Sequence, residues 1–177
     1  MPDRVPVGVV GVGHLGALHA DKYAARDDVE LVAVYDRDVD RAATVAARLG
    51  CRVDPSLSDV LASCRAISVA VPVVAHETVG LTAIAAGCHV LMEKPLAASL
   101  AAGERLVAAS SDAGVLLQVG HIERFNPVVR DLRHIVSHPR FVECHRLAPF
   151  AGRGTDTDVV LDVMIHDLDL LAYLVDD

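Results

Sequence analysis

A glycine motif near the start of the chain limits its possible folds more than any other feature. An apolar run at residues 5–10 leads directly into Gly11, Gly13 and Gly16, which follow the spacing G-x-G-x-x-G. A stretch that favours a helix comes next, and a second apolar run then ends at Asp36, about 20 residues beyond the third glycine. Strand, glycine turn, helix, strand and acid in this order predict a dinucleotide-binding βαβ unit. A glycine turn without a nucleotide is the alternative, and the presence of every part argues against it.

Each residue of the motif has a physical role in holding a dinucleotide. Gly11 permits the tight turn, Gly13 lets the backbone approach a pyrophosphate, and Gly16 lets the helix lie close to the strand. The helix that starts at His14 offers free N–H groups and a partial positive charge to the phosphates. Asp36 can accept hydrogen bonds from a ribose diol and would repel a 2′-phosphate, so we expect the cofactor to be NAD rather than NADP.

Apolar runs alternate with helical stretches over the first two thirds of the sequence. The predicted strands are residues 5–10, 31–35, 51–53, 66–71, 89–92 and 115–119. The predicted helices are residues 14–26, 39–49, 58–63, 76–86 and 99–110. This alternation favours an α/β fold with a doubly wound parallel sheet, an NAD-binding Rossmann domain at residues 1–121. The composition agrees, because 53% of the residues are hydrophobic and much of that content is Ala and Val, which suit helices on a buried parallel sheet.

Ligands of doubly wound sheets bind beyond the carboxyl ends of the strands. His14 and His76 are therefore expected to pack beside the cofactor, and Glu93 is expected to contact the cofactor ribose or Lys94. Arg37 argues against the preference for NAD, because its side chain could turn toward the 2′-phosphate of NADP. The candidate cofactor-binding residues are Gly11, Gly13, His14, Leu15, Gly16, Asp36, Arg37, Val71, Pro72, His76, Glu93 and Lys94.

Charge and cysteine content exclude several classes of partner and compartment. The formal net charge is −8 without a long basic run, which argues against nucleic acid and anionic membranes as partners. The four cysteines have no C-x-x-C spacing, so we interpret them as reduced, mostly buried thiols of a cytoplasmic protein. No signal-peptide pattern opens the sequence, and its least charged stretch, residues 78–92, is too short to span a bilayer.

Beyond His121 the pattern changes, and residues 122–177 are predicted to form part of a second α+β domain. We expect a helix at 125–136, a strand at 140–147, a loop at 149–156 and one long helix at 158–175. The last helix is apolar around most of its circumference, apart from one polar stripe: Asp158, Asp162, His166, Asp169 and Tyr173. Such a stripe usually faces solvent or a polar cleft. Asp162 and His166 also have the spacing of a metal-ligand pair, but no third ligand accompanies them, so no metal is expected.

Together these features resemble a known family. The glycine motif, Asp36, the tripeptide Glu93-Lys94-Pro95 after the fifth predicted strand, and Asp162-x-x-x-His166 look like the glucose–fructose oxidoreductase/inositol dehydrogenase family. The resemblance covers the whole chain, and within the family residues 119–127 and 159–170 look most like bacterial nucleotide-sugar dehydrogenases. It implies oxidation of a ring hydroxyl of a UDP-linked amino sugar, a homo-oligomer, and a cis peptide between Lys94 and Pro95.

The residue types suit the oxidation of a secondary alcohol, in which carbon loses a hydride and oxygen loses a proton. A nicotinamide takes the hydride, and a positioned base, for which histidine is the usual choice, takes the proton. We assign the base to His166. Asp162, one helical turn earlier, could orient the imidazole or bind a neighbouring hydroxyl. Lys94 could hold the substrate hydroxyl and stabilise the developing alkoxide; without the family resemblance it would be an exposed lysine after a strand.

The substrate-binding residues are expected in the second part of the chain. His121, Arg124 and Asn126 are predicted to line the cleft between the domains. Arg146 and Arg153 are candidates for a substrate diphosphate, because a guanidinium pairs well with phosphate, although each could equally be an ordinary surface charge.

Two function classes remain open after this reading. One is an NAD-dependent sugar dehydrogenase acting on a nucleotide sugar, a free sugar or inositol. The other is a nucleotide-binding module or a truncated chain without catalysis. The presence of both Lys94 and His166 favours the dehydrogenase. The length favours the module, because one predicted strand cannot form the large open sheet of the family's second domain. We therefore expect an incomplete version of a two-domain enzyme that binds cofactor but has weak turnover.

Overall fold

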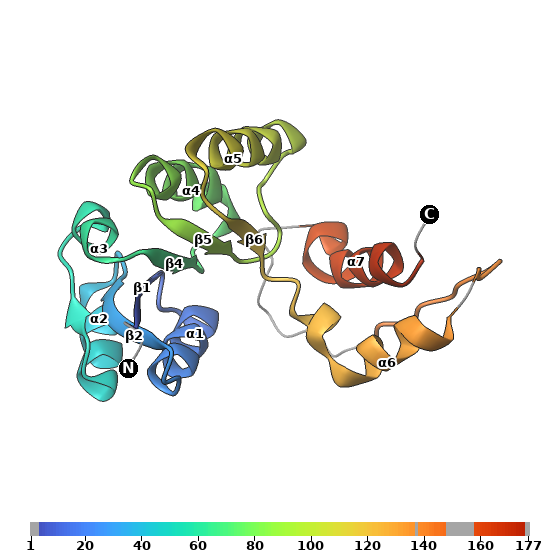
Figure 1. The fold of residues 1–177 in the computed structure, drawn as a ribbon, viewed down its shortest axis with the longest axis horizontal. Helices are drawn as coiled ribbons and strands as arrows, with labels where there is room; N and C mark the ends of the chain where they lie inside the picture. The colour runs from blue at the N-terminus through green and yellow to red at the C-terminus, as the bar shows by residue number, and fades with distance from the viewer. Residues whose placement is uncertain (1–3, 137, 148–157, 176–177) are drawn as a thin grey trace. The chain divides into compact units, whose positions relative to one another are not determined.

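The computed structural model describes residues 4–136, 138–147 and 158–175, which Figure 1 draws in colour. The chain divides into two compact units, Met1–Val119 and Gly120–Asp177. We call them the first unit and the second unit and describe each by itself.

A six-stranded parallel sheet forms the centre of the first unit, with the strand order β3-β2-β1-β4-β5-β6. The strands are β1 (Val5–Val10), β2 (Val29–Tyr35), β3 (Arg52–Val53), β4 (Ala66–Val69), β5 (His89–Met92) and β6 (Leu117–Val119). The order reverses between β1 and β4, and such a reversal is the point at which open α/β sheets bind ligands. The doubly wound sheet predicted from the sequence is confirmed.

Helices cover both faces of this sheet, as Figure 1 shows for α1 and α2 against α4 and α5. The helices are α1 (His14–Ala24), α2 (Val39–Leu49), α3 (Leu57–Ser63), α4 (His76–Ala85) and α5 (Leu100–Ala113), with a short 3₁₀ turn η1 (Val73–Ala75) before α4. One apolar core includes Val9 and Val34 of the sheet with Ala20, Ala42 and Val45 of α1 and α2. The other core joins the opposite side of the strands to α3, α4 and α5. The near-continuous apolar strands therefore bury both of their faces.

Local residue choices set the ends of the helices. Asp38 accepts a hydrogen bond from the Arg41 N–H at the start of α2 (3.0 Å), and Ser99 does the same for Ala102 at α5 (3.3 Å). Both are N-caps that satisfy an otherwise unpaired N–H group. Gly50 ends α2 with a φ of 72°, a left-handed conformation that glycine adopts without strain.

Among the described residues, the second unit consists of short helices. They are the 3₁₀ turn η2 (Ile122–Phe125), α6 (Pro127–Ile135), the π-helical turn η3 (Val160–Met164) and α7 (Ile165–Leu174). Asn126 caps α6 by accepting from the Val128 N–H at 3.1 Å, and Pro127 occupies its first turn, as the sequence predicts. Helices η2, α6 and α7 contact one another.

One prediction for the second unit is wrong, and one is confirmed with a difference. Residues 140–147 form no strand, because the alternation found there has no neighbouring strand among the described residues to supply hydrogen bonds. The helix predicted at 158–175 does not have a uniform α-helical period, since its first turn, η3, is a π-helix. The loop predicted at 149–156 lies outside the described residues.

Candidate functional site

The glycine turn lies at the switch point of the sheet, between β1 and α1. Gly11 has a φ of +81°, and its N–H donates to the Tyr35 carbonyl at 2.8 Å. A Cβ at Gly11 would lie 2.7 Å from the Ala70 carbonyl oxygen. Both the backbone angle and the close approach of Ala70, just after β4, therefore require glycine at this position.

The other two glycines differ in what surrounds them. A Cβ at Gly16 would overlap the carbonyl oxygen of Gly11, whereas a Cβ at Gly13 would meet nothing within 4 Å. Gly16 is thus needed for the packing of α1 on the turn. Gly13 faces open space, which fits the closeness to a pyrophosphate predicted for it. His14 and Leu15, at the start of α1, are both exposed.

Asp36, at the end of β2, is held by the backbone on both carboxylate oxygens. Oδ2 accepts from the Val12 N–H at 2.8 Å and Oδ1 from the Asp38 N–H at 2.9 Å. The guanidinium of Arg41 approaches Oδ1 at 3.4 Å. The arginine predicted from the sequence to lie near the 2′ position was Arg37, which is exposed. Arg41 was not predicted. A signal for Arg41 was available, because it follows the N-cap Asp38 by three residues and so faces it across the first turn of α2.

His76 ties together the two loops that follow β4 and β5. Its side chain is buried, and its ring nitrogens lie 2.9 Å from the Val71 and Pro95 carbonyl oxygens. Val71 and Pro72 begin the first of these loops. The imidazole thus holds the backbone of both loops at the carboxyl edge of the sheet, where Val71, Pro72 and His76 are predicted to contact cofactor.

Glu93 follows β5 and is almost fully buried. Its Oε1 lies 3.0 Å from His19 Nε2, and its Oε2 accepts from the Lys94 N–H at 3.2 Å. Burial raises the pKa of Glu93, but the hydrogen bond and charge of His19 and the N–H and charge of Lys94 outweigh it, so the pKa lies below its usual value. The carboxylate is therefore ionised at neutral pH. The sequence reading found no signal in His19.

Lys94 is half-buried, and its peptide bond to Pro95 is cis, as the family resemblance predicts. It belongs to the first unit, whereas Asp162 and His166 belong to the second. Asp162 lies within η3 and His166 in the first turn of α7, and both are half-buried. The π-helical turn is notable, because such turns often occur at functional sites.

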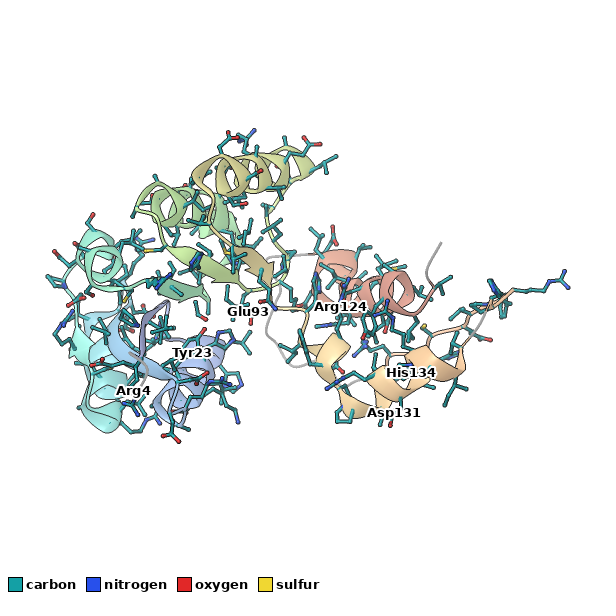
Figure 2. All side chains as sticks on the ribbon, in the orientation of Figure 1. Arg4, Tyr23, Glu93, Arg124, Asp131 and His134 are labelled. Carbon is teal, nitrogen blue, oxygen red and sulfur yellow. The ribbon has the colours of Figure 1, made fainter. Side chains whose placement is uncertain are left out.

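Arg124 and Asp169 form a partly buried ion pair in the second unit. Arg124 Nη2 and Nε donate to the two oxygens of Asp169 at 2.5 and 2.8 Å, a bidentate arrangement. Arg124 is labelled in Figure 2, and its guanidinium also lies over the Tyr173 ring at 5.5 Å. Asp169 is the buried residue of α7, while Leu168 beside it is 44% exposed. Of the two surroundings predicted for the polar stripe of this helix, solvent or a polar cleft, solvent is wrong for Asp169, which is buried against Arg124 of η2.

The remaining predicted substrate residues have structural partners or lie outside the described residues. His121 Nδ1 is buried without a hydrogen bond and lies 3.7 Å from Asp169. Asn126 uses its side chain to cap α6. Arg146 forms an ion pair with Asp167 at 2.8 Å, so its charge is already compensated. Arg153 lies outside the described residues. Substrate contacts of His121, Arg124 and Asn126 stay predictions.

Removal of Arg124 is expected to destabilise the second unit more than removal of its partner. Arg124→Ala removes the bidentate partner of the buried Asp169 carboxylate and leaves only His121 Nδ1 nearby, at 3.7 Å, at a cost of about 2–3 kcal/mol. In Asp169→Ala the guanidinium, whose side chain is 39% exposed, can turn to solvent, so the cost is smaller. Hydrogen exchange of the α7 amides in the two variants measures this difference. Equal exchange in both would contradict the ranking.

No group of three or more potential metal ligands occurs among the described histidines, cysteines, aspartates and glutamates. In the same part of the chain, no helix has the length and apolar character needed to cross a bilayer.

Comparison with known proteins identifies relatives along the entire chain. A model described as an oxidoreductase family with an NAD-binding Rossmann fold matches residues 5–121. UDP-N-acetylglucosamine 3-dehydrogenase of Acidithiobacillus ferrooxidans is 44% identical over 168 residues, which are 94% of this chain and 53% of the relative. Inositol 2-dehydrogenase 3 of Saccharopolyspora erythraea is 35% identical over 98% of this chain and 54% of the relative. The chain thus spans about half the length of these curated relatives.

Solved structures give the same result. The UDP-N-acetylglucosamine 3-dehydrogenase of Acidithiobacillus ferrooxidans matches with a TM-score of 0.92 and 42% identity, over 97% of this chain and 56% of that one. GenD2 from gentamicin A biosynthesis, solved in complex with NAD, matches with a TM-score of 0.83 and 29% identity, over 98% of this chain and 54% of the other.

Proposed function

Because this chain belongs to the oxidoreductase family with an NAD-binding Rossmann fold, the Gfo/Idh/MocA family, we propose that it binds NAD and takes part in oxidising a ring hydroxyl of a nucleotide-linked amino sugar. The observation that carries the proposal is the set of residues at the carboxyl edge of the sheet: the glycine turn at the switch point, Asp36 after β2, and Glu93-Lys94 after β5. The 44% identical relative named for UDP-N-acetylglucosamine supports the substrate class.

The residues present fit a dinucleotide. The open space beside Gly13 leaves room for a pyrophosphate at the start of α1, where free N–H groups favour an anion. Asp36 already accepts two backbone N–H groups, but each carboxylate oxygen has a second lone pair for a ribose hydroxyl. When bound, the nicotinamide supplies the hydride acceptor.

Side chains of this protein would accept the proton that the substrate hydroxyl loses. His166 is proposed as the base that removes the hydroxyl proton, because an imidazole changes its charge near neutral pH. Asp162 would orient that imidazole or bind an adjacent hydroxyl. Lys94 would donate a hydrogen bond to the reacting oxygen and stabilise the negative charge that develops there.

NAD is expected to bind at least about tenfold more tightly than NADP, a difference of roughly 1.4 kcal/mol. A 2′-phosphate would be repelled by Asp36, and Arg41 offsets only part of that repulsion because it already pairs with Asp36 and Asp38. Calorimetric titration of both cofactors measures the ratio. Arg41→Ala should increase the preference for NAD over NADP, and Asp36→Asn should decrease it. Tighter binding of NADP by the unchanged chain would reverse the assignment.

A substrate panel tests the proposed reaction. NAD reduction is followed with UDP-N-acetylglucosamine, other UDP-sugars, free N-acetylglucosamine and myo-inositol. We expect the UDP-linked amino sugars to be the best substrates. A preference for myo-inositol would favour the second candidate, which the inositol 2-dehydrogenases among the relatives support. Cofactor binding without reduction of NAD by any of these compounds would favour a nucleotide-binding module.

A further inference from the structure

A series of polar side chains in contact with one another lies within the first unit, between α1 and the loop after β5. Tyr23 Oη lies 2.8 Å from Ser68 Oγ, and Ser68 Oγ lies 3.1 Å from His19 Nδ1. The other ring nitrogen of His19 reaches Glu93, which in turn accepts from the backbone N–H of Lys94. Figure 2 labels Tyr23 and Glu93, the first and last side chains of this series. We call Tyr23, Ser68, His19 and Glu93 the polar relay.

The polar relay lies in the interior. Ser68 has no exposed surface, the Glu93 side chain is 10% exposed and that of His19 is 18% exposed. Buried polar groups destabilise a fold unless their hydrogen bonds are made. The contacts allow one consistent assignment with a neutral imidazole, in which Tyr23 donates to Ser68, Ser68 to His19 Nδ1, and His19 Nε2 to Glu93. Packing alone would be served at lower cost by apolar side chains, so the series needs another explanation.

The polar relay ends at Lys94, the residue that the proposed function places at the reacting oxygen. We propose that His19 is a positioning residue for Lys94. Its imidazole, fixed by Ser68, holds the Glu93 carboxylate, and the carboxylate holds the Lys94 backbone and shares its charge with the Lys94 ammonium. This inference rests on the proposed role of Lys94, but the positioning itself can be measured without turnover.

His19 controls how fully the Glu93 charge acts on Lys94. While the imidazole donates to Oε1, the carboxylate divides its attraction between His19 and Lys94. Without that donor the carboxylate, which is too buried to be solvated well, has Lys94 as the remaining cation that acts on it, and we expect it to shift toward that residue. Loss of the imidazole should therefore change the surroundings of the Lys94 side chain.

The sequence makes this measurement simple, because Lys22 and Lys94 are its only lysines. Reductive methylation with ¹³C-formaldehyde keeps the positive charge and gives one methyl signal for each lysine. The α-amino group is methylated as well, so Lys22→Arg and Lys94→Arg together assign the three signals. We expect His19→Leu to move the Lys94 signal. His19→Gln, whose amide can donate to Glu93 and accept from Ser68, should return the signal toward its position in the unchanged chain.

Lys22 is an internal control, since it lies on α1 beside the polar relay. A displaced helix would move the signals of Lys22 and Lys94 together, and would overturn the proposal in favour of a structural role for His19. An unchanged Lys94 signal in His19→Leu would overturn it as well, as would a Gln variant that behaves like the Leu variant. Loss of dehydrogenase activity in every preparation would refute the proposed function alone, because the methyl signals report on Lys94 in either case.

Discussion

We expect Lys94→Ala to lower the turnover of a nucleotide sugar by on the order of 10²–10⁴-fold, while the dissociation constant of NAD stays within about twofold. The reason is the position of Lys94 after β5, away from the glycine turn that would hold the pyrophosphate. Initial rates of NAD reduction and calorimetric NAD titrations separate the two quantities. Lys22→Ala is the matched control, because it removes the other lysine of the first unit and should leave both unchanged.

His166→Ala should have an effect of the same size if His166 is the base. The pH profile then distinguishes a base from a residue that only binds substrate, because loss of a base removes the rise of kcat with pH. His145→Gln is the control, since His145 is an exposed histidine paired with Glu143. Near wild-type turnover in either Lys94→Ala or His166→Ala would remove that residue from the mechanism.

Gly16→Ala is expected to raise the dissociation constant of NAD by at least about 100-fold, which corresponds to roughly 2.7 kcal/mol. The new methyl group would overlap the carbonyl oxygen of Gly11, so α1 must move away from the turn. Such overpacking costs typically 1–3 kcal/mol in stability and displaces the backbone. Circular dichroism melting and NAD titration would record both effects.

Gly13→Ala is the matched comparison, because its Cβ would meet no protein atom within 4 Å. The melting temperature should stay close to that of the unchanged chain. A selective loss of NAD affinity would then report a ligand in the open space beside Gly13. If Gly13→Ala bound NAD as well as the unchanged chain, the pyrophosphate would not approach the backbone there.

The first unit was predictable because its signals are local. Residues 5–10, 39–49 and 89–92 have the bounds predicted for them, since each run is closed by a glycine, a cap or a polar turn that the sequence displays. The switch point follows from the order of the elements and needs no knowledge of distant contacts. Asp36 and the glycine turn could be assigned for the same reason.

The second unit was harder to predict because its pattern depends on partners. Alternation at residues 140–147 indicates a strand only when another strand is available, and none is described there. Along α7, the polar stripe predicted either solvent or a polar cleft, and the sequence could not decide between them, because Asp169 is buried by Arg124, which lies 45 positions earlier. His19 was missed in the first unit for a similar reason. Its partners Ser68 and Glu93 lie close together only because β4 and β5 are neighbours in the sheet, and no spacing in the sequence indicates this.

The way Asp36 is held has a consequence for how this protein could be converted from one cofactor to the other, by design or by evolution. Its carboxylate accepts the N–H groups of Val12 and Asp38, so it organises the turn in addition to the ribose contact proposed for it. Exchange to glycine or alanine would leave a partly buried N–H group without an acceptor, at a cost of about 1–3 kcal/mol. The accessible mutational route therefore keeps an acceptor at position 36 and changes the surrounding charge, most directly through Arg37 and Arg41.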